Sequence, residues 1–387
     1  MFPPIQTVST GCVVAIVGFF SSFPIVLKGL DAVGATAEQA ASGLMFAALS
    51  MGITGLLLAL WTRQPVSVAW STPGAALLAI TPIAAGAGFS EAVFGFAVAG
   101  ALTLLSGFWR PLSRLMTSIP PALAHAMLAG VLLSLCIVPF QAMAETPQSA
   151  IPIVATWFVA GLINRLLAVP AAVIAALLVV GGATGFDIPL TGGVVTAPVL
   201  VIPEPNLAAI VNIGLPLFLV TMATQNVPGI AVLRSFGYTP EPRPLLAAVG
   251  GASILSAPFG APATCLAAIT AAMCANPESH PDPKQRYWSA VMAGGVYCLF
   301  GLFAATITAV AAAAPPMVLG TLAGLALIGV FTNSAHAALS DEAHRDAAAI
   351  TFLTTASGMA LFGLSAAVWG LILGGAVYAI KARMRKP

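Results

Sequence analysis

The stretch Pro65–Ile80, PVSVAWSTPGAALLAI, decides the fold that the sequence predicts. Its first part, residues 66–70, is short, apolar and partly β-branched, which is typical of a strand. Ser71 and Thr72 then stand before Pro73, an order typical of a helix N-terminus, and small apolar residues follow. The stretch therefore predicts a strand that runs directly into a short helix.

The composition of the 387-residue chain is that of a membrane protein. Hydrophobic residues make up 59% of it and charged residues 7%, whereas about 25% of a soluble domain is charged. Apolar runs of about 18 or more residues recur, and each is long enough to cross a bilayer. Broken backbone at membrane depth is tolerated only where it is buried in protein or lines a cavity. The strand and short helix therefore indicate a binding site of the kind found in transporters.

Landmarks in the first half of the chain repeat in the second half in the same order. The stretch Gly260–Ile269 can be laid over Ser71–Ile80 so that Pro, Leu, Ala and Ile coincide. Two further pairs are Ser21–Pro24 with Gln225–Pro228, and Pro120-Pro121 with Pro315-Pro316. This order indicates an internal duplication, and it predicts a second short strand followed by a half-helix at about 260–275.

We expect fourteen membrane segments, seven in each half. With the N-terminus in the cytoplasm, alternation places every lysine and arginine except Lys28 on the cytoplasmic side, which agrees with the positive-inside rule. Seven segments in each half make the second repeat inverted relative to the first. The expected fold is thus an all-α multi-pass membrane protein with both termini cytoplasmic and short strands before half-helices 3 and 10. Gly320 with Gly324, and Gly370 with Gly374, predict close helix packing.

Three motifs carry a resemblance to a known family: FSSFPIVLKGLDAVGAT from Phe20, QPVSVAWSTPGAALL from Gln64 and TQNVPGIAVLRSFGY from Thr224. With them the chain resembles the BenE family, the benzoate/proton symporters of bacteria, over essentially its whole length. The resemblance implies a bacterial inner-membrane protein with the fold of uracil and xanthine permeases and of sulfate-permease-type anion transporters.

That fold implies four parts that alternate along the chain. Segments 1–4 (residues 1–115) and 8–11 (residues 207–314) are expected to form a core domain that carries the substrate. Segments 5–7 (residues 116–206) and 12–14 (residues 315–387) are expected to form a gate domain. The gate domain is often the dimerisation surface in this fold, so a homodimer through it is one expectation.

The resemblance implies a substrate site between the N-termini of half-helices 3 and 10, beside segments 1 and 8. Helix N-termini present unpaired N–H groups and partial positive charge, which suit a carboxylate. Uracil-type members hold the base with glutamates in segments 8 and 10, but the matching residues here are not acidic, which argues against a nucleobase. The expected substrate-binding residues are Ser21, Ser22, Phe23, Trp70, Ser71, Thr72, Thr224, Gln225, Asn226, Phe259, Gly260 and Ala261.

The route of the coupled proton stays open, because no Asp or Glu falls well inside a predicted span. His125 and His336 are candidates, since histidine titrates near neutral pH, although a lone histidine in a membrane is more often a packing residue. The proton can also travel on the substrate as neutral benzoic acid. Lys28 and Asp31 near the outer end of the first span have one simple interpretation, an ion pair at the membrane surface.

No cofactor, metal or nucleic-acid partner is expected. The five cysteines are scattered without a CxxC spacing, and the charged run Asp341–Asp346 is interpreted as a solvated loop rather than a metal site. No nucleophile and base are arranged as in an enzyme. The expected function is import of an aromatic carboxylate, benzoate above all, by proton symport through alternating access. A carrier of another organic anion or of a nucleobase, and an anion channel, are the alternatives.

Overall fold

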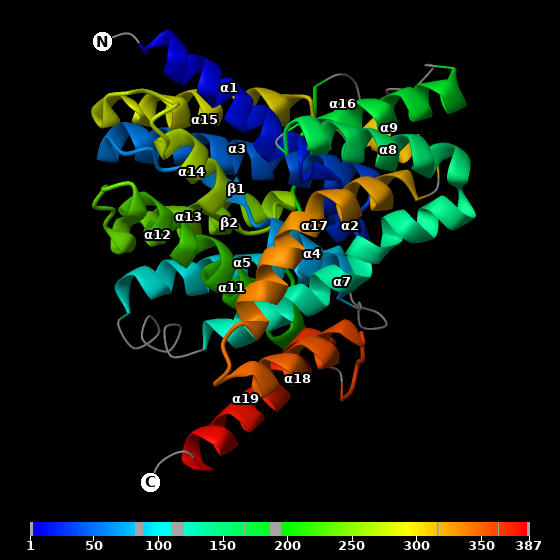
Figure 1. Cartoon of the computed structure of the whole chain (residues 1–387), viewed down its shortest axis with the longest axis vertical. Coiled ribbons are helices and arrows are strands. Elements are labelled where there is room, and N and C mark those ends of the chain that lie inside the picture. Colours follow the sequence, from blue (N-terminus) through cyan, green and yellow to red (C-terminus); the bar gives the residue numbers. More distant parts are fainter. Residues whose placement is uncertain are drawn as a thin grey trace.

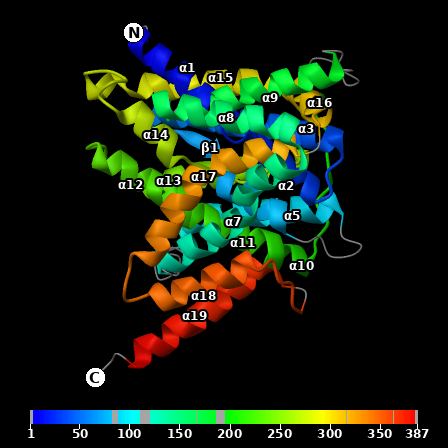
Figure 2. The same ribbon diagram turned by 45° about the vertical axis from the view of Figure 1, so that its right-hand side comes forward.

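A computed structural model gives the structure of residues 3–81, 88–109, 120–165, 167–185, 195–315, 317–362 and 364–384, which form an almost wholly helical protein (Figures 1 and 2). The first half contains α1 (Ile5–Phe20), α2 (Phe23–Ala32), α3 (Ala37–Thr62), β1 (Val68–Trp70), α4 (Thr72–Ile80), α5 (Phe89–Phe108), α7 (Pro121–Glu145), α8 (Pro147–Ile163) and α9 (Ala168–Thr184). The second half contains α10 (Leu207–Ala209), α11 (Leu215–Thr221), α12 (Val227–Ser235), α13 (Pro242–Ser256), β2 (Thr264–Leu266), α14 (Ala268–Ala275), α15 (Tyr287–Leu302), α16 (Ala304–Ala312), α17 (Val318–Leu339), α18 (Arg345–Ala356) and α19 (Ala366–Met384).

Several of these helices are long and apolar enough to cross a membrane. Within the described residues there are six such helical stretches, or seven if α15 and α16, bent by 56° at their junction, count as one span. The helices α8, α9 and α19 are apolar but shorter. The protein is therefore a mostly helical, multi-pass membrane protein, while the count of fourteen segments as inverted repeats stays a prediction.

The first long helix of each half is interrupted near a proline. Between α1 and α2 the chain breaks at Ser21 and Ser22, and Pro24 lies in the first turn of α2. In the second half, π-helical turns at Ile210–Gly214 and Met222–Asn226 separate α10, α11 and α12. A proline removes a backbone donor inside a helix, and π-helical turns are frequent at functional sites.

Close packing joins two pairs of helices at the glycines that the sequence predicts. α17 packs along α7, and α18 packs against both α7 and α19. A Cβ on Gly324 of α17 would lie 2.5 Å from the carbonyl oxygen of Leu135 in α7, and one on Gly374 of α19 would overlap Thr351 of α18. Both contacts are made within one chain. Figure 1 shows α18 and α19 at the C-terminal end of the long axis, far from α1.

Candidate substrate site

Two short strands lie side by side near the middle of the described structure. β1 and β2 pair antiparallel, with Ala69 opposite Cys265 at the centre. The pairing continues past the strands, because the N–H of Ser71 donates to the carbonyl of Ala263 and that of Ala267 donates to Ser67. α4 therefore leaves one end of the strand pair and α14 leaves the other. A strand precedes each half-helix, as predicted, but β2 lies within the stretch 260–275 that was predicted to be helical.

The N-terminus of α4 is built by the serine that the sequence places there. The Oγ of Ser71 accepts a hydrogen bond from the N–H of Gly74 at 3.0 Å and shares another with the hydroxyl of Thr221 at 2.7 Å. Ser71 has no exposed surface, so its hydroxyl joins α4 to α11. Thr72 is half-buried and has no side-chain hydrogen bond among the described residues, which leaves its hydroxyl available.

The prediction for the start of the second half-helix is wrong. α14 begins at Ala268, and Gly260 and Ala261 lie before β2. Gly260 has φ 85°, and a Cβ there would contact Phe89 at 3.1 Å. The two stretches share a proline, but Pro73 lies in the first turn of α4 whereas Pro262 lies outside regular secondary structure, just before β2. The ring of Phe259 stacks on Phe46 at 3.9 Å.

The break between α1 and α2 brings serines and aromatic rings together. Trp70 donates from Nε1 to the Oγ of Ser22 at 2.9 Å, and its ring lies edge-on to that of Phe19 at 5.1 Å. Ser22 and Ser21 both donate to the carbonyl of Gly18. These hydroxyls are hydrogen-bonded to the backbone of α1 and to the indole of Trp70. They therefore stabilise the conformation of the break between α1 and α2.

The corresponding part of the second half is fixed by an asparagine. The Oδ1 of Asn226 accepts the backbone N–H of Leu266 at 2.8 Å, and the side chain has no exposed surface. Thr224 donates to the carbonyl of Val220 at 2.6 Å. Gln225 is half-buried, and its side chain makes no hydrogen bond within the described part of the chain. Among the predicted residues of this helix, Gln225 therefore has the amide that is available to a ligand.

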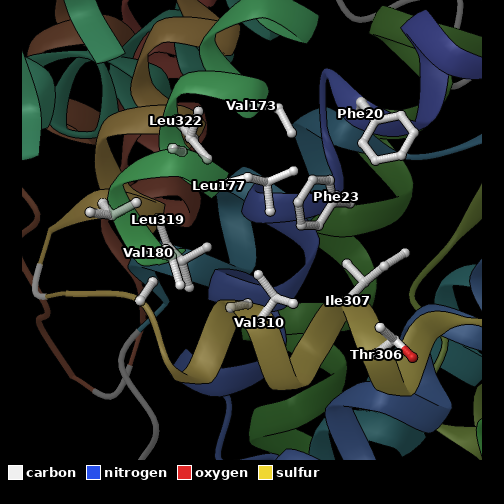
Figure 3. Close-up of a pocket in the computed structure, with 14 residues that line it drawn as sticks. Phe20, Phe23, Val173, Leu177, Val180, Thr306, Ile307, Val310, Leu319 and Leu322 are labelled. Atoms are coloured by element: carbon white, nitrogen blue, oxygen red, sulfur yellow. The ribbon is translucent and has the colours of Figure 1, made fainter. Parts of the chain in front are cut away.

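An apolar cavity of about 140 Å³ adjoins the break between α1 and α2. Figure 3 shows the rings of Phe20 and Phe23 facing Val173, Leu177 and Val180 of α9, with Leu319 and Leu322 of α17 on the same side as α9 and with Thr306, Ile307 and Val310 from α16. Thr306 is its sole polar lining residue among those described. A cavity of about 150 Å³ with apolar walls is large enough to bind benzene. The cavity can therefore hold one aromatic ring.

Sequence reasoning places Phe20 and Phe23 beside the ligand but misses the walls that α9, α16 and α17 contribute to this cavity. The lining residues of α9, α16 and α17 are alanine, valine, leucine and isoleucine for the most part, and such residues are equally common at lipid-facing positions. The predicted residues Ser71, Thr72, Gln225 and Phe259 do not line this cavity.

The two histidines differ in environment. His125 of α7 is half-buried, and its Nδ1 is buried without a hydrogen-bond partner in the described structure. His336 is exposed in the last turn of α17. Neither lines the apolar cavity.

The charged run Asp341–Asp346 is held by ion pairs within one end of the protein. His344 Nδ1 lies 2.6 Å from Asp341 Oδ2, and this hydrogen bond holds the pKa of the Asp341 carboxyl below its usual value. Lys381 of α19 pairs with Asp346. The residues that the structure describes include no group of three His, Cys, Asp or Glu side chains suited to a metal ion.

Solved structures share this fold. The transmembrane domain of the cyanobacterial bicarbonate transporter BicA matches 99% of this chain and 97% of its own length, with a TM-score of 0.61 and 15% identity. SLC26A9 matches 98% of this chain and 65% of its own length, with a TM-score of 0.65 and 11% identity. These likenesses define a helical membrane protein with the fold of the BicA and SLC26A9 transporters.

Sequence similarity narrows this class to one family. The chain belongs to the BenE family of benzoate membrane transport proteins, whose model matches residues 2–380. It is 40% identical to the inner membrane protein YdcO of Escherichia coli over 97% of this chain and 96% of that protein. It is 30% identical to the benzoate membrane transport protein of Acinetobacter baylyi over 96% of this chain and 93% of that protein.

Proposed function

We propose that this protein is a secondary active transporter that imports an aromatic monocarboxylate, benzoate first, by proton symport through alternating access. The observation that carries the proposal is the apolar cavity beside Phe20 and Phe23, whose volume of about 140 Å³ suits one benzene ring. The relative from Acinetobacter baylyi, a benzoate membrane transport protein by name, supports the same substrate.

The ring of the substrate gains free energy by leaving water for this cavity. Apolar area removed from water contributes about 25 cal/mol per Å², and the cavity already has aromatic walls, since Phe20 and Phe23 lie edge to face at 6.0 Å. Aromatic rings favour such edge-to-face contacts. A planar ring substituted at one position fits this chemistry better than a polar nucleobase does.

The carboxylate needs donors, and the N-terminus of α4 is the proposed source. A helix N-terminus favours a negative charge by about 0.3–1 kcal/mol when exposed and by up to ~2 kcal/mol when partly buried. The Thr72 hydroxyl and the Gln225 amide are the available polar groups on the adjoining elements. Ser71 and Asn226 act as positioning residues, because their hydrogen bonds hold α4 and β2 in place.

For the mechanism we propose the division into core and gate that the sequence predicts. Residues 1–115 and 207–314 form the core, and residues 116–206 and 315–387 form the gate. The tight packing of α17 on α7, and of α18 on α7 and α19, supports movement of the gate helices as one body. The apolar cavity has walls from α1, α2 and α16 of the core and from α9 and α17 of the gate. Relative motion of the two parts would then open the cavity to one side of the membrane at a time.

For the proton we propose that it joins the carboxylate after the anion has bound, so that substrate and proton cross together as neutral benzoic acid. The hydrogen-bonding side chains around the pair of β1 and β2 are hydroxyls and amides, which do not titrate near neutral pH. His125 is the alternative carrier, because its Nδ1 is buried without a described partner.

Both termini are proposed to be cytoplasmic in an inner membrane, with the gate as the surface of a homodimer. Cysteines placed at Val195 and Lys284, both in exposed positions, should then react with an impermeant reagent from opposite sides.

Counterflow tests the proposed function and separates a carrier from a channel. Proteoliposomes loaded with unlabelled benzoate are diluted into labelled benzoate at equal pH on both sides. A carrier exchanges the two and accumulates label transiently, whereas a channel does not. Because neutral benzoic acid crosses lipid unaided, protein-free vesicles of the same lipid give the background. No overshoot above that background would contradict the proposal.

The anion preference is tested with a neutral substrate of the same shape. Benzamide should compete at least about 100-fold less well than benzoate, since each factor of ten corresponds to ~1.4 kcal/mol. Thr72→Val should weaken benzoate binding with little change in stability. Ser71→Ala should lower stability by about 1 kcal/mol, because it removes a helix cap. Equal competition by benzamide would favour the nucleobase-like alternative.

A further inference from the structure

A second, larger cavity lies next to the apolar one and contains charged residues. Its volume is about 560 Å³, and its walls include Lys28 and Asp31 of α2, Val138 of α7 and Gly320 of α17. It shares Ala311 and Leu319 with the apolar cavity. The two cavities are therefore neighbours, and Ala311 and Leu319 lie between them.

The position of Lys28 is unusual for a lysine near the end of a membrane helix. Such lysines ordinarily extend their ammonium groups to the lipid surface. The Nζ of Lys28 instead lies across the cavity, 3.7 Å from the place that a Cβ on Gly320 would occupy. The ammonium group therefore lies against the first turn of α17, where the absence of a side chain on Gly320 allows close packing on Val138 of α7, since a Cβ there would lie 2.8 Å from Val138 Cγ1.

Lys28 has no anionic partner within the described residues. The lysine is half-buried, yet no ion pair or hydrogen bond joins its side chain to Asp31 or to any other described residue. The simple interpretation of these two residues as an ion pair is therefore wrong. A charge in a partly buried site is costly unless it is paired, and ionisable groups at membrane depth commonly mark the path of a substrate.

We propose that the Lys28 cavity is the entry chamber of the transporter, where the Lys28 ammonium captures the carboxylate of the substrate before its ring passes Ala311 and Leu319 into the apolar cavity. This inference rests on the proposed function for the identity of the anion. Asp31 lowers the positive potential of the same chamber, so its charge opposes capture. In the proposed orientation the chamber faces the outside of the cell. Lys28 is the one lysine or arginine that the predicted topology places on that side.

The first test compares transport kinetics of the full-length protein in proteoliposomes. Lys28→Gln should raise the KM for benzoate about tenfold or more, as expected for a lost charge-assisted contact, and should change the maximal rate less than about twofold. Lys28→Arg should restore a KM near that of the unchanged protein, and Asp31→Asn should lower it. Added salt should raise the KM of the unchanged protein but not that of Lys28→Gln. An unchanged KM in Lys28→Gln would overturn the inference.

The second test needs no substrate and so separates this inference from the proposed function. Ala312 lines the chamber and is exposed, so an Ala312→Cys variant without the native cysteines reports the local potential. The rate of reaction with an anionic methanethiosulfonate, divided by the rate with a cationic one, should fall about fivefold or more when Lys28→Gln is added. An unchanged ratio would overturn the inference even if benzoate is transported. A changed ratio without benzoate transport would support the anion chamber and reject benzoate as its substrate.

Discussion

The indole Nε1 of Trp70 donates a hydrogen bond to the Oγ of Ser22 at 2.9 Å, and both residues are buried. This bond joins the end of β1 to the break between α1 and α2, next to the Phe23 ring that lines the apolar cavity. In the second half, the N–H of Leu266 donates to Asn226 at 2.8 Å. Each interrupted helix is thus held to the strand beside it by one buried hydrogen bond.

Trp70→Phe should destabilise the protein and loosen the break. The change removes the donor to Ser22 and leaves a void, and together these effects cost about 2 kcal/mol or more. Thermal unfolding in detergent should show a lower midpoint than for the unchanged protein. Trp61→Phe is the matched control, because Trp61 is 67% exposed and its replacement should cost less than ~0.5 kcal/mol. Equal midpoints for the two variants would contradict the role of the Trp70 bond.

Ala176→Phe should fill the apolar cavity. Ala176 lines the cavity and is 4% exposed, so the added ring takes the place of the substrate ring. We expect benzoate binding, measured by calorimetry, to weaken by about tenfold or more, while stability stays the same or rises. Leu178→Phe changes the exposed side of the same helix and should leave binding unchanged. Undiminished binding in Ala176→Phe would move the ring site elsewhere.

Gly374→Ala should weaken the packing of α19 on α18. A Cβ at this position would overlap the hydroxyl of Thr351 and lie 2.9 Å from the carbonyl oxygen of Ala347. At Gly375, one residue further along the helix, a Cβ would meet nothing within 4 Å. Gly375→Ala should therefore stabilise the helix by up to about 1 kcal/mol. The midpoint of thermal unfolding should be highest for Gly375→Ala, intermediate for the unchanged protein and lowest for Gly374→Ala. The reverse order of midpoints would contradict the packing of α19 on α18.

His125→Ala and His336→Ala should each retain gradient-driven uptake if the substrate carries the proton. Neither side chain lines the cavity, and His336 is exposed. The measurement is initial benzoate uptake with and without an inward proton gradient. If one variant still exchanges benzoate but no longer responds to the gradient, that histidine is the proton carrier and the substrate-borne route is wrong.

The sequence around β1 was sufficient to predict the first half-helix, because its cap, proline and strand are all local signals. It was not sufficient for the second, because α14 begins at Ala267-Ala268 without a capping side chain or a proline. The shared letters around Pro262 then shifted the prediction toward Gly260. Asn226 was predicted as a ligand, but its partner Leu266 is forty positions away, and such long-range hydrogen bonds leave no local pattern. The walls of the cavity had no signal distinct from lipid-facing residues.

The initial rate of labelled benzoate uptake under an imposed pH gradient tests the central claim most directly. Proteoliposomes buffered near neutral pH are diluted into acidic medium, and rates from protein-free vesicles are subtracted at each benzoate concentration. The account predicts a saturable, protein-dependent rate that rises at least about fivefold with the inward proton gradient and that excess unlabelled benzoate, but not benzamide, suppresses. A protein-dependent rate that is absent, or equal with and without the gradient, would contradict proton-coupled benzoate transport.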